Sequence, residues 1–278
     1  EQMLFNYLQG NVQGRVTIPD RRAATLIQPA GRDFQDFWRS TMKWIGGIAI
    51  LGMLAVLAIF YLVRGTIRIE AGPSGRTIQR FNGVERFAHW LTASTFIVLG
   101  ITGLNITFGR ELLLPLIGPD AFTAWSELAK VAHNYLSFPF TLGVALMLVL
   151  WIKDNLPSAT DARWFAEGGG LIGHGHPPAR KFNAGQKLIF WSVVLGGAAI
   201  AVTGYIMMFP FQFWATDIAG MQLAIQLHGI IALVMIAIIL AHIYIGSLGM
   251  EGAFAAMGTG RVDLNWAKEH HSLWVDEM

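Results

Sequence analysis

The stretch LHGIIALVMIAIILAHIYIG, residues 227–246, decides the fold because it is long and apolar enough to cross a lipid bilayer. It nevertheless carries two ionisable side chains, His228 and His242, fourteen positions apart. An α-helix rises about 1.5 Å and turns about 100° per residue, so these side chains share one face and lie roughly 21 Å apart along the axis. The stretch therefore predicts a membrane helix with one histidine toward each surface of the bilayer.

The composition of the whole chain is that of a membrane protein. Its 278 residues are 54% hydrophobic and only 14% charged, with a mean hydropathy of +0.47, whereas soluble domains carry about 25% charged residues. The formal net charge of +2 is too small to favour nucleic acid. Cysteine is absent, so Cys-ligated iron–sulfur clusters, Cys zinc sites, disulfides and c-type haem are excluded.

Five stretches reach the length of about 20 apolar residues that a membrane-spanning helix needs. They are residues 44–63, 87–108, 131–152, 188–209 and 222–248. The sequence therefore predicts an all-α membrane protein with five transmembrane helices. Residues 81–250 are expected to form a four-helix bundle, with 44–63 as an additional N-terminal helix, residues 1–43 as a polar extramembrane arm and 251–278 as a tail.

Lys and Arg in the loops predict the orientation, because they are enriched on the cytoplasmic side of membrane proteins. The loops before the second and fourth spans carry five each, whereas the loop before the third carries two and the loop before the fifth none. The two basic loops lie on one side, which predicts a cytoplasmic C-terminus and a periplasmic N-terminus in the bacterial inner membrane. The arm has six Lys or Arg of its own, which run against this orientation.

Four histidines lie within or at the ends of the apolar spans, where ionisable residues are costly and mark function. In the predicted topology, His133 and His228 lie near the outer surface, and His89 and His242 near the inner surface. Facing histidines suit bis-imidazole ligation of haem iron, and a haem without an open position transfers electrons. The sequence therefore predicts an outer and an inner haem stacked across the membrane.

Two other classes of protein remain open at this point. A histidine-lined metal or proton transporter would gather its site near the midplane and recruit carboxylates, but spans two to five contain no Asp or Glu. An inert membrane anchor would leave the four histidines unexplained. His174 and His176, in a loop rich in Gly and Pro, are interpreted as solvated residues, and His270 and His271 as surface residues of the tail.

The segment ARKFNAGQKLIFW, residues 179–191, opens the fourth span on the predicted inner side. On its own it indicates a helix start, with Asn183 as the N-cap and lysines that reach toward water. Its depth matches the inner haem, where electrons would leave the chain. A quinone needs polar groups at its carbonyls beside an apolar slot, which Asn183, Gln186 and Lys187 provide next to two aromatic residues. Arg86, near His89, is predicted to pair with the propionates of the inner haem.

Six motifs, in order and spacing, resemble the gamma subunit of membrane-bound formate dehydrogenase, a di-haem cytochrome b. They are RFAHW (86–90), AHNYLSF (132–138), KFNAGQKLIFWS (181–192), LHGIIA (227–232), HIYIG (242–246) and WAKEHHSLW (266–274). The NAGQK element and the tail motif separate the chain from the cytochrome b subunits of nickel–iron hydrogenases, which are the closest alternative. The extra helix resembles the long form of the family.

The resemblance implies that His89, His133, His228 and His242 ligate two haem b groups in the pairing given above. It implies a quinone pocket beside the inner haem at Asn183, Gly185, Gln186 and His242, for ubiquinone or menaquinone. It also implies two partners: a catalytic subunit with a molybdenum or tungsten pterin, which oxidises formate, and an iron–sulfur subunit that passes the electrons on. The chain would then serve a respiratory chain as its electron-transfer and quinone-reducing subunit. The arm, including residues 14–34, is expected to contact the outer partners.

Overall fold

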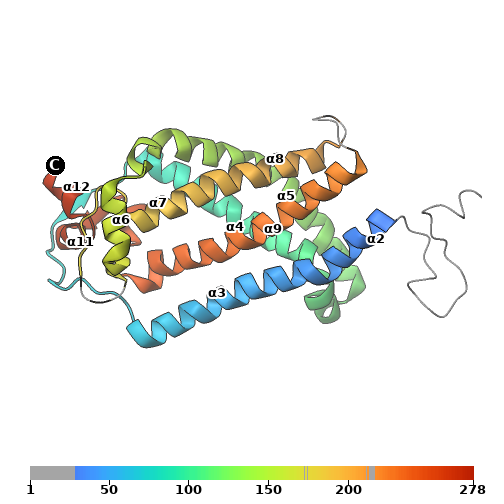
Figure 1. The fold of residues 1–278 in the computed structure, drawn as a ribbon, viewed down its shortest axis with the longest axis horizontal. Coiled ribbons are helices and arrows are strands. Elements are labelled where there is room, and N and C mark those ends of the chain that lie inside the picture. The colour runs from blue at the N-terminus through green and yellow to red at the C-terminus, as the bar shows by residue number, and fades with distance from the viewer. Residues whose placement is uncertain (1–28, 172, 174, 211, 213–216) are drawn as a thin grey trace, which may run out of the picture.

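The fold is a bundle of long helices, seen in a computed structural model that describes residues 29–171, 173, 175–210, 212 and 217–278 (Figure 1). Five helical stretches in these residues are long and apolar enough to cross a membrane. They are Gly31–Arg64, Gly83–Leu112, Leu114–Trp151, Ala184–Met208 and Ile218–Gly249. The predicted five spans are confirmed within the described part of the chain.

Three of the five stretches are α-helices interrupted or ended by a π-helical turn. The first consists of α2 (Pro29–Asp36), the turn Phe37–Thr41 and α3 (Met42–Arg64). The second and third are α4 (Gly83–Leu112) and α5 (Leu114–Trp151). The fourth joins α7 (Ala184–Trp191) through Ser192–Gly196 to α8 (Gly197–Met208), and the fifth is α9 (Ile218–Tyr244) followed by Ile245–Gly249.

Helix α9 packs against both α3 and α8, while α4 and α5 pack along each other (Figure 1). Glycines let α3 approach α9. A Cβ on Gly46 would lie 2.7 Å from Phe108 and 3.0 Å from Leu233, and a Cβ on Gly229 would lie 2.6 Å from Met42. Small residues of this kind allow close contact between membrane helices. The additional helix is thus held mainly by α9.

The first helix begins earlier than the boundary at residue 43 that the sequence predicts. The described residues are helical from Pro29 onward, so the last part of the predicted polar arm is helical. Trp38 and Met42 lie against Gly229 of α9, which gives these polar turns a surface to pack on. Residues 1–28, and with them most of the segment predicted to contact partner subunits, lie outside the described residues.

Helix α5 also begins earlier than its apolar span. It starts at Leu114, and its axis breaks at Gly118, whose φ of 78° and ψ of 169° are not helical. Pro119 then opens the continuous part of the helix, where its missing N–H leaves no hydrogen bond unmade. The stretch before residue 131, predicted as a loop, is therefore largely helical because polar helical turns extend the apolar span.

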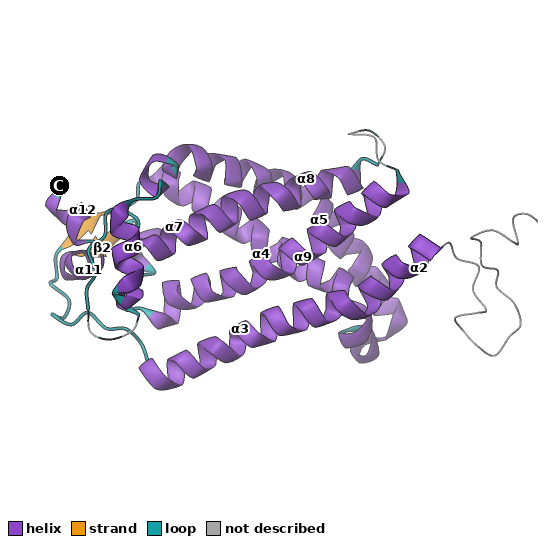
Figure 2. Cartoon of the chain, in the orientation of Figure 1, coloured by secondary structure: helices purple, strands orange, loops and turns teal. Residues whose placement is uncertain are grey.

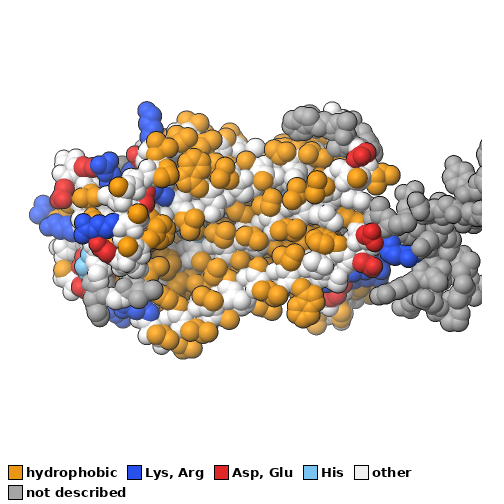
Figure 3. Space-filling model, in the orientation of Figure 1, with side chains coloured by type: hydrophobic (Ala, Val, Ile, Leu, Met, Phe, Trp, Pro, Cys, Tyr) orange, Lys and Arg blue, Asp and Glu red, His pale blue; other side chains and the backbone are white. Residues whose placement is uncertain are grey.

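Apolar side chains cover the middle of the visible face of the bundle, and charged side chains gather at its two ends (Figure 3). Within α3 only Met42 and Gly46 are buried, so nearly its whole surface is apolar and exposed. This distribution suits a helix surrounded by lipid. We call the end that carries the C-terminus the tail end, and the end at which α2 begins the arm end.

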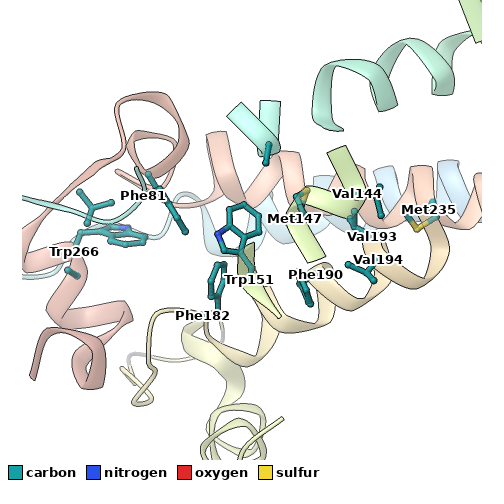
Figure 4. Close-up of a cluster of buried hydrophobic side chains, with 14 of the residues drawn as sticks. Phe81, Val144, Met147, Trp151, Phe182, Phe190, Val193, Val194, Met235 and Trp266 are labelled. Atoms are coloured by element: carbon teal, nitrogen blue, oxygen red, sulfur yellow. The ribbon is translucent and has the colours of Figure 1, made fainter. Parts of the chain in front are cut away.

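A small cap covers the tail end of the bundle (Figure 2). It contains α6 (Ala159–Ala166), α10 (Ala255–Gly258), α11 (Leu264–His270), α12 (Ser272–Asp276) and an antiparallel pair of strands, β1 (Thr77–Gln79) and β2 (Arg261–Asp263). The strands join the loop after α3 to the C-terminal segment. Phe81, two residues after β1, lies between Trp266 on one side and Trp151 and Phe182 on the other (Figure 4).

Candidate functional site

The arm-end half of the bundle brings His133 of α5 opposite His228 of α9. The centroids of the two imidazole rings lie 6.2 Å apart, and the ring planes are inclined by 63°. We call these two residues the arm pair. The sequence predicts this pairing, because both histidines fall at one depth on the third and fifth spans, which run in the same direction across the membrane.

Two threonines fix the orientation of the arm-pair imidazoles. Thr102 Oγ1 lies 2.8 Å from His133 Nδ1, and Thr203 Oγ1 lies 3.1 Å from His228 Nδ1. Each hydroxyl donates its proton to a carbonyl one helical turn earlier, of Val98 at 2.8 Å or of Ala199 at 2.7 Å. The threonine oxygens can therefore only accept from Nδ1–H. This leaves the Nε2 lone pair of each histidine free to bind a metal.

The tail-end half of the bundle brings His89 of α4 opposite His242 of α9. The ring centroids are again 6.2 Å apart, with the planes inclined by 60°. His89 also lies 5.1 Å from the ring of Trp90. Its Nδ1 is buried and has no hydrogen-bond partner among the residues that the structure describes. We call His89 and His242 the tail pair, which shares the spacing of the arm pair but has no threonine on His89.

Both pairs have the spacing that two imidazoles on one iron require. A metal–imidazole bond is about 2 Å long, and the ring centroid lies about 1.1 Å behind the nitrogen, so the two centroids are expected roughly 6 Å apart. Glycines face the arm pair: a Cβ on Gly103 would lie 3.5 Å from His133, and one on Gly204 would lie 3.2 Å from His228. No third His, Cys, Asp or Glu joins either pair among the described residues. Two axial ligands are what a porphyrin, with four nitrogens of its own, needs, so the residues fit haem.

Arg86 lies at the tail end, three positions before His89. Its Nε donates to the carbonyl of Met257 at 3.0 Å, and its Nη2 donates to the carbonyl of Gly258. Trp90 Nε1 donates to the same Met257 carbonyl at 2.9 Å. Arg86 therefore ties α10 to α4, and pairing with a haem propionate would use its remaining N–H groups.

Asn183 and Gln186 form a capping box at the start of α7. Asn183 Oδ1 accepts from the Gln186 backbone N–H at 2.9 Å, and Gln186 Oε1 accepts from the Asn183 backbone N–H at 3.1 Å. The predicted N-cap is thus confirmed. The side-chain NH2 groups of both residues have no partner among the described residues, so they remain able to donate to a ligand. Gly185 lies close to Trp164, since a Cβ there would be 3.0 Å from the indole ring.

Lys187 is bound by α6 and the loop before it. Its Nζ lies 2.9 Å from Asp161 Oδ2, 2.9 Å from the Leu156 carbonyl and 3.3 Å from Ser158 Oγ. These three contacts use all three ammonium protons. The structure thus gives Lys187 an anchoring role, which differs from the quinone contact that the sequence predicts. The same ion pair holds the pKa of Asp161 below its usual value, against the opposing effect of burial.

The tail histidines were predicted as surface residues, and this prediction is wrong. His270 is 9% exposed and His271 is fully buried, because the β1–β2 pair folds α11 back onto the bundle. Burial lowers the pKa of His270 to about 4 and that of His271 well below its usual value. The two tryptophans that flank the histidine pair, Trp266 and Trp274, were the sequence signal that this tail packs rather than extends into water.

Arg80 lies beside these histidines. The sequence shows it only as one of the five basic residues of the loop before the second span. It is 4% exposed and stacks on the rings of Phe81, Trp266 and Trp274 at 5.2–5.3 Å. Its Nη2 donates to the Lys181 carbonyl at 2.6 Å and to Gln186 Oε1 at 3.3 Å. Burial lowers its pKa to about 9. His176 lies near this cluster, whereas His174 is outside the described residues.

Comparisons with known proteins place this geometry in context. A family profile described as "Prokaryotic cytochrome b561" matches residues 80–260. The "Formate dehydrogenase, cytochrome b556(fdo) subunit" of Escherichia coli (strain K12) is 28% identical over 73% of this chain and 93% of that protein. The "Formate dehydrogenase, cytochrome b556 subunit" of Haemophilus influenzae is 29% identical over 76% of this chain and 87% of that protein. The profile match contains both histidine pairs and leaves α3 outside it.

Proposed function

The chain belongs to the prokaryotic cytochrome b561 family, and from this premise we propose that it is the cytochrome b subunit of a formate dehydrogenase that passes electrons through the membrane to a quinone. It is an integral membrane protein of a haem b family. The observation that carries the proposal is the shared 6.2 Å ring spacing of the arm pair and the tail pair. Two equally spaced histidine pairs at two depths suit two haems that pass electrons across the membrane.

His133 and His228 would hold one haem b, and His89 and His242 the other. Haem held in this way would supply reversible one-electron transfer. The protein's own contribution is to fix the two ligand pairs on packed helices and to surround them with apolar side chains. Thr102 and Thr203 set the tautomer of the arm-pair ligands. Helix α9 contributes one ligand to each pair, which fixes the distance between the two sites.

We place the tail end in the cytoplasm and the arm end in the periplasm of a bacterial inner membrane. The loops at the tail end carry ten Lys or Arg before the second and fourth spans, against two in the loops at the arm end. Electrons would then enter at the arm pair from an iron–sulfur partner subunit, which receives them from a pterin-containing catalytic subunit. Reporter fusions after Gly109 and Gly170 should report opposite sides, and a common side would break this topology.

The quinone is proposed to bind at the tail end, beside His242. The unpartnered side-chain NH2 groups of Asn183 and Gln186 would donate to a quinone carbonyl, and Gly185 lets the backbone lie close. The double variant Asn183→Ala with Gln186→Ala should abolish quinone reduction by the complex. Haem reduction by formate should stay normal in this variant, because that reaction precedes the quinone. Normal quinone reduction would place the site elsewhere.

The experiment that tests the function uses the complex purified with its partner chains. Formate should reduce the haem b of this chain, seen in the optical spectrum, and quinol should then form. Reduction by hydrogen and not by formate, with a nickel–iron partner in the mass spectrum, would instead show a hydrogenase cytochrome b. If neither formate nor hydrogen reduces the haem, the electron-transfer role is contradicted and a metal or proton transporter becomes the better interpretation.

A further inference from the structure

The tail end holds a cluster of buried polar side chains to which the proposed function assigns no role. Its members are Arg80, Trp266, His270 and His271, which we call the tail cluster. Among the described residues, eleven buried side-chain nitrogen or oxygen atoms have no hydrogen-bond partner, and five of them belong to these four residues. Buried polar atoms are nearly always satisfied by protein or by water. Such a concentration marks a place where water or a ligand completes the bonding.

The five atoms complement one another chemically. His271 Nδ1 lies 2.7 Å from the Arg180 carbonyl and must donate to it, so Nε2 of the neutral ring carries the lone pair and accepts. Arg80 Nε and Nη1 and Trp266 Nε1 are donors. His270 Nε2 donates or accepts according to its tautomer. Donors and acceptors enclosed together are what bridging waters connect.

The cluster is linked inward to the proposed quinone site. Arg80 Nη2 donates to Gln186 Oε1 at 3.3 Å, and Gln186 belongs to the capping box that is proposed to bind the quinone. It is linked outward to solvent through His176. The rings of His176 and His270 lie 6.3 Å apart, and His176 Nε2 lies 3.2 Å from Glu70 Oε2. Glu70 and His176 have side chains that are 50% and 35% exposed.

We infer that Glu70, His176 and His270 carry protons from the aqueous phase through the tail cluster to the quinone at Asn183 and Gln186. The inference rests on the proposed quinone site. Reduction of a quinone to a quinol takes two electrons, which arrive through the chain, and two protons, one for each carbonyl oxygen. The bundle around the site is apolar, so these protons need a polar path. The relay supplies it from the tail end, where reduction would take up protons on the side opposite to formate oxidation.

The charges around His270 suit a histidine that is neutral before quinone reduction and is protonated only transiently during it. Burial, His176 and Arg80 lower its pKa, while Glu269 opposes them and raises it. Glu269 is itself fixed, because its carboxylate accepts from the backbone N–H groups of Glu70 and Ala71 at 3.1 and 3.0 Å. Negative charge gained at the quinone would raise the proton affinity of the cluster. Electron arrival would thereby draw the proton inward.

The test uses the intact complex in lipid vesicles with a short-chain quinone. His270→Gln keeps a polar side chain of similar length but cannot carry a proton. We expect quinone reduction to slow about tenfold or more, with a larger solvent deuterium isotope effect, since losing a proton-transfer group costs on the order of 100-fold in many enzymes. Haem content and haem reduction by formate should stay unchanged. Lys268→Gln, on the exposed face of the same helix, is the matched control and should leave all these values unchanged.

His176→Gln repeats the test at a half-exposed position, so that it decides the matter if His270→Gln yields no haem-loaded complex. Normal rates and isotope effects in His176→Gln and in any His270→Gln complex that assembles would overturn the relay. If Asn183→Ala with Gln186→Ala still abolishes quinone reduction in that case, the quinone site stands and only the relay fails. If this double variant is also normal, both the site and the relay are wrong.

Discussion

The arm pair and the tail pair have the same ring spacing but different surroundings. Both place their centroids 6.2 Å apart, and both take one histidine from α9. In the arm pair, each Nδ1 meets a threonine hydroxyl. In the tail pair, His89 Nδ1 has no partner in the described part of the chain, and the cationic Arg86 lies one turn away. Bundle geometry thus sets where the histidines lie, while neighbouring residues set the hydrogen bonding and charge around them.

This difference predicts a direction for electron flow. A histidine that donates from Nδ1 is a more basic ligand and stabilises oxidised iron, which lowers the reduction potential. A nearby cation without that hydrogen bond raises the potential instead. The arm-end haem is therefore expected to have the lower potential and the tail-end haem the higher one. Electrons would move spontaneously from the arm end toward the proposed quinone site.

The largest effect is expected when one histidine is removed from either pair. His228→Ala should lose the arm-end haem and His242→Ala the tail-end haem, because each leaves an iron with one axial ligand. In His228→Ala formate should no longer reduce the remaining haem, whereas in His242→Ala it should still do so without quinol forming. Haem content and optical spectra measure both. Val234→Ala, a partly exposed position between them on α9, is the control. Loss of both haems in each variant would show that the sites are not separate.

Acid should destabilise the tail end, where His270 is buried. The pKa of His270 is about 4 in the folded chain, against 6.5 for the free side chain. Between these values the unfolded chain binds more protons, so stability is complete above about pH 6.5 and falls as the pH drops to about 4, by on the order of 3 kcal/mol. Thermal unfolding at several pH values, followed by the spectrum of each haem, measures this. His270→Gln should reduce the acid sensitivity, and unchanged sensitivity would show that another group is responsible.

Thr102→Val and Thr203→Val should change the reduction potential of the arm-end haem without removing it. Each variant keeps the side-chain shape and removes the acceptor for a histidine Nδ1–H. A net loss of about 1 kcal/mol corresponds to an upward shift of about 40 mV in a one-electron potential. A redox titration should show this shift for the arm-end haem only. Thr107→Val on α4, whose hydroxyl bonds only to the Gly103 carbonyl, should shift neither. An equal shift of both haems would remove the proposed role of the threonines.

The smallest effect is expected for the ion pair of Lys43 with Glu111, which joins α3 to α4 at the arm end. The two side chains are 29% and 46% exposed. Exposed ion pairs contribute about 0–1 kcal/mol. Lys43→Ala should therefore change the unfolding temperature by a few degrees at most and leave both haems in place. Loss of the arm-end haem would mean that α3 supports the arm pair more than its contacts indicate.

Much of the helical bundle could be predicted because each helix that crosses a bilayer needs about 20 mostly apolar residues, and such stretches are visible in the sequence. The fourteen-residue spacing of His228 and His242 fixed one face of α9, and the helix cap at Asn183 was predicted from its residue type. The helical structure of residues 29–43 and the start of α5 were not predicted, since polar turns continue a membrane helix beyond its apolar part. Gly118 and Pro119 gave a visible signal for α5.

The features missed at the site depend on contacts between distant parts of the chain. His270 and His271 are buried because strand β2 pairs with β1, whose residues lie far away in sequence. Thr102 and Thr203 are on different helices from the histidines that they orient, so no local pattern shows the contact. The ion pair of Lys187 with Asp161, on α6, likewise joins residues of separate helices. Each of these requires knowledge of tertiary packing.

The most direct test of the account is the number of haems bound by the chain. The purified complex, with the protein concentration of this chain fixed by amino-acid analysis, can be assayed as the pyridine haemochrome. Two haem b groups per chain are expected, one for each histidine pair. A count of one or none would contradict the two-site electron path that the equal spacing of the arm pair and the tail pair supports.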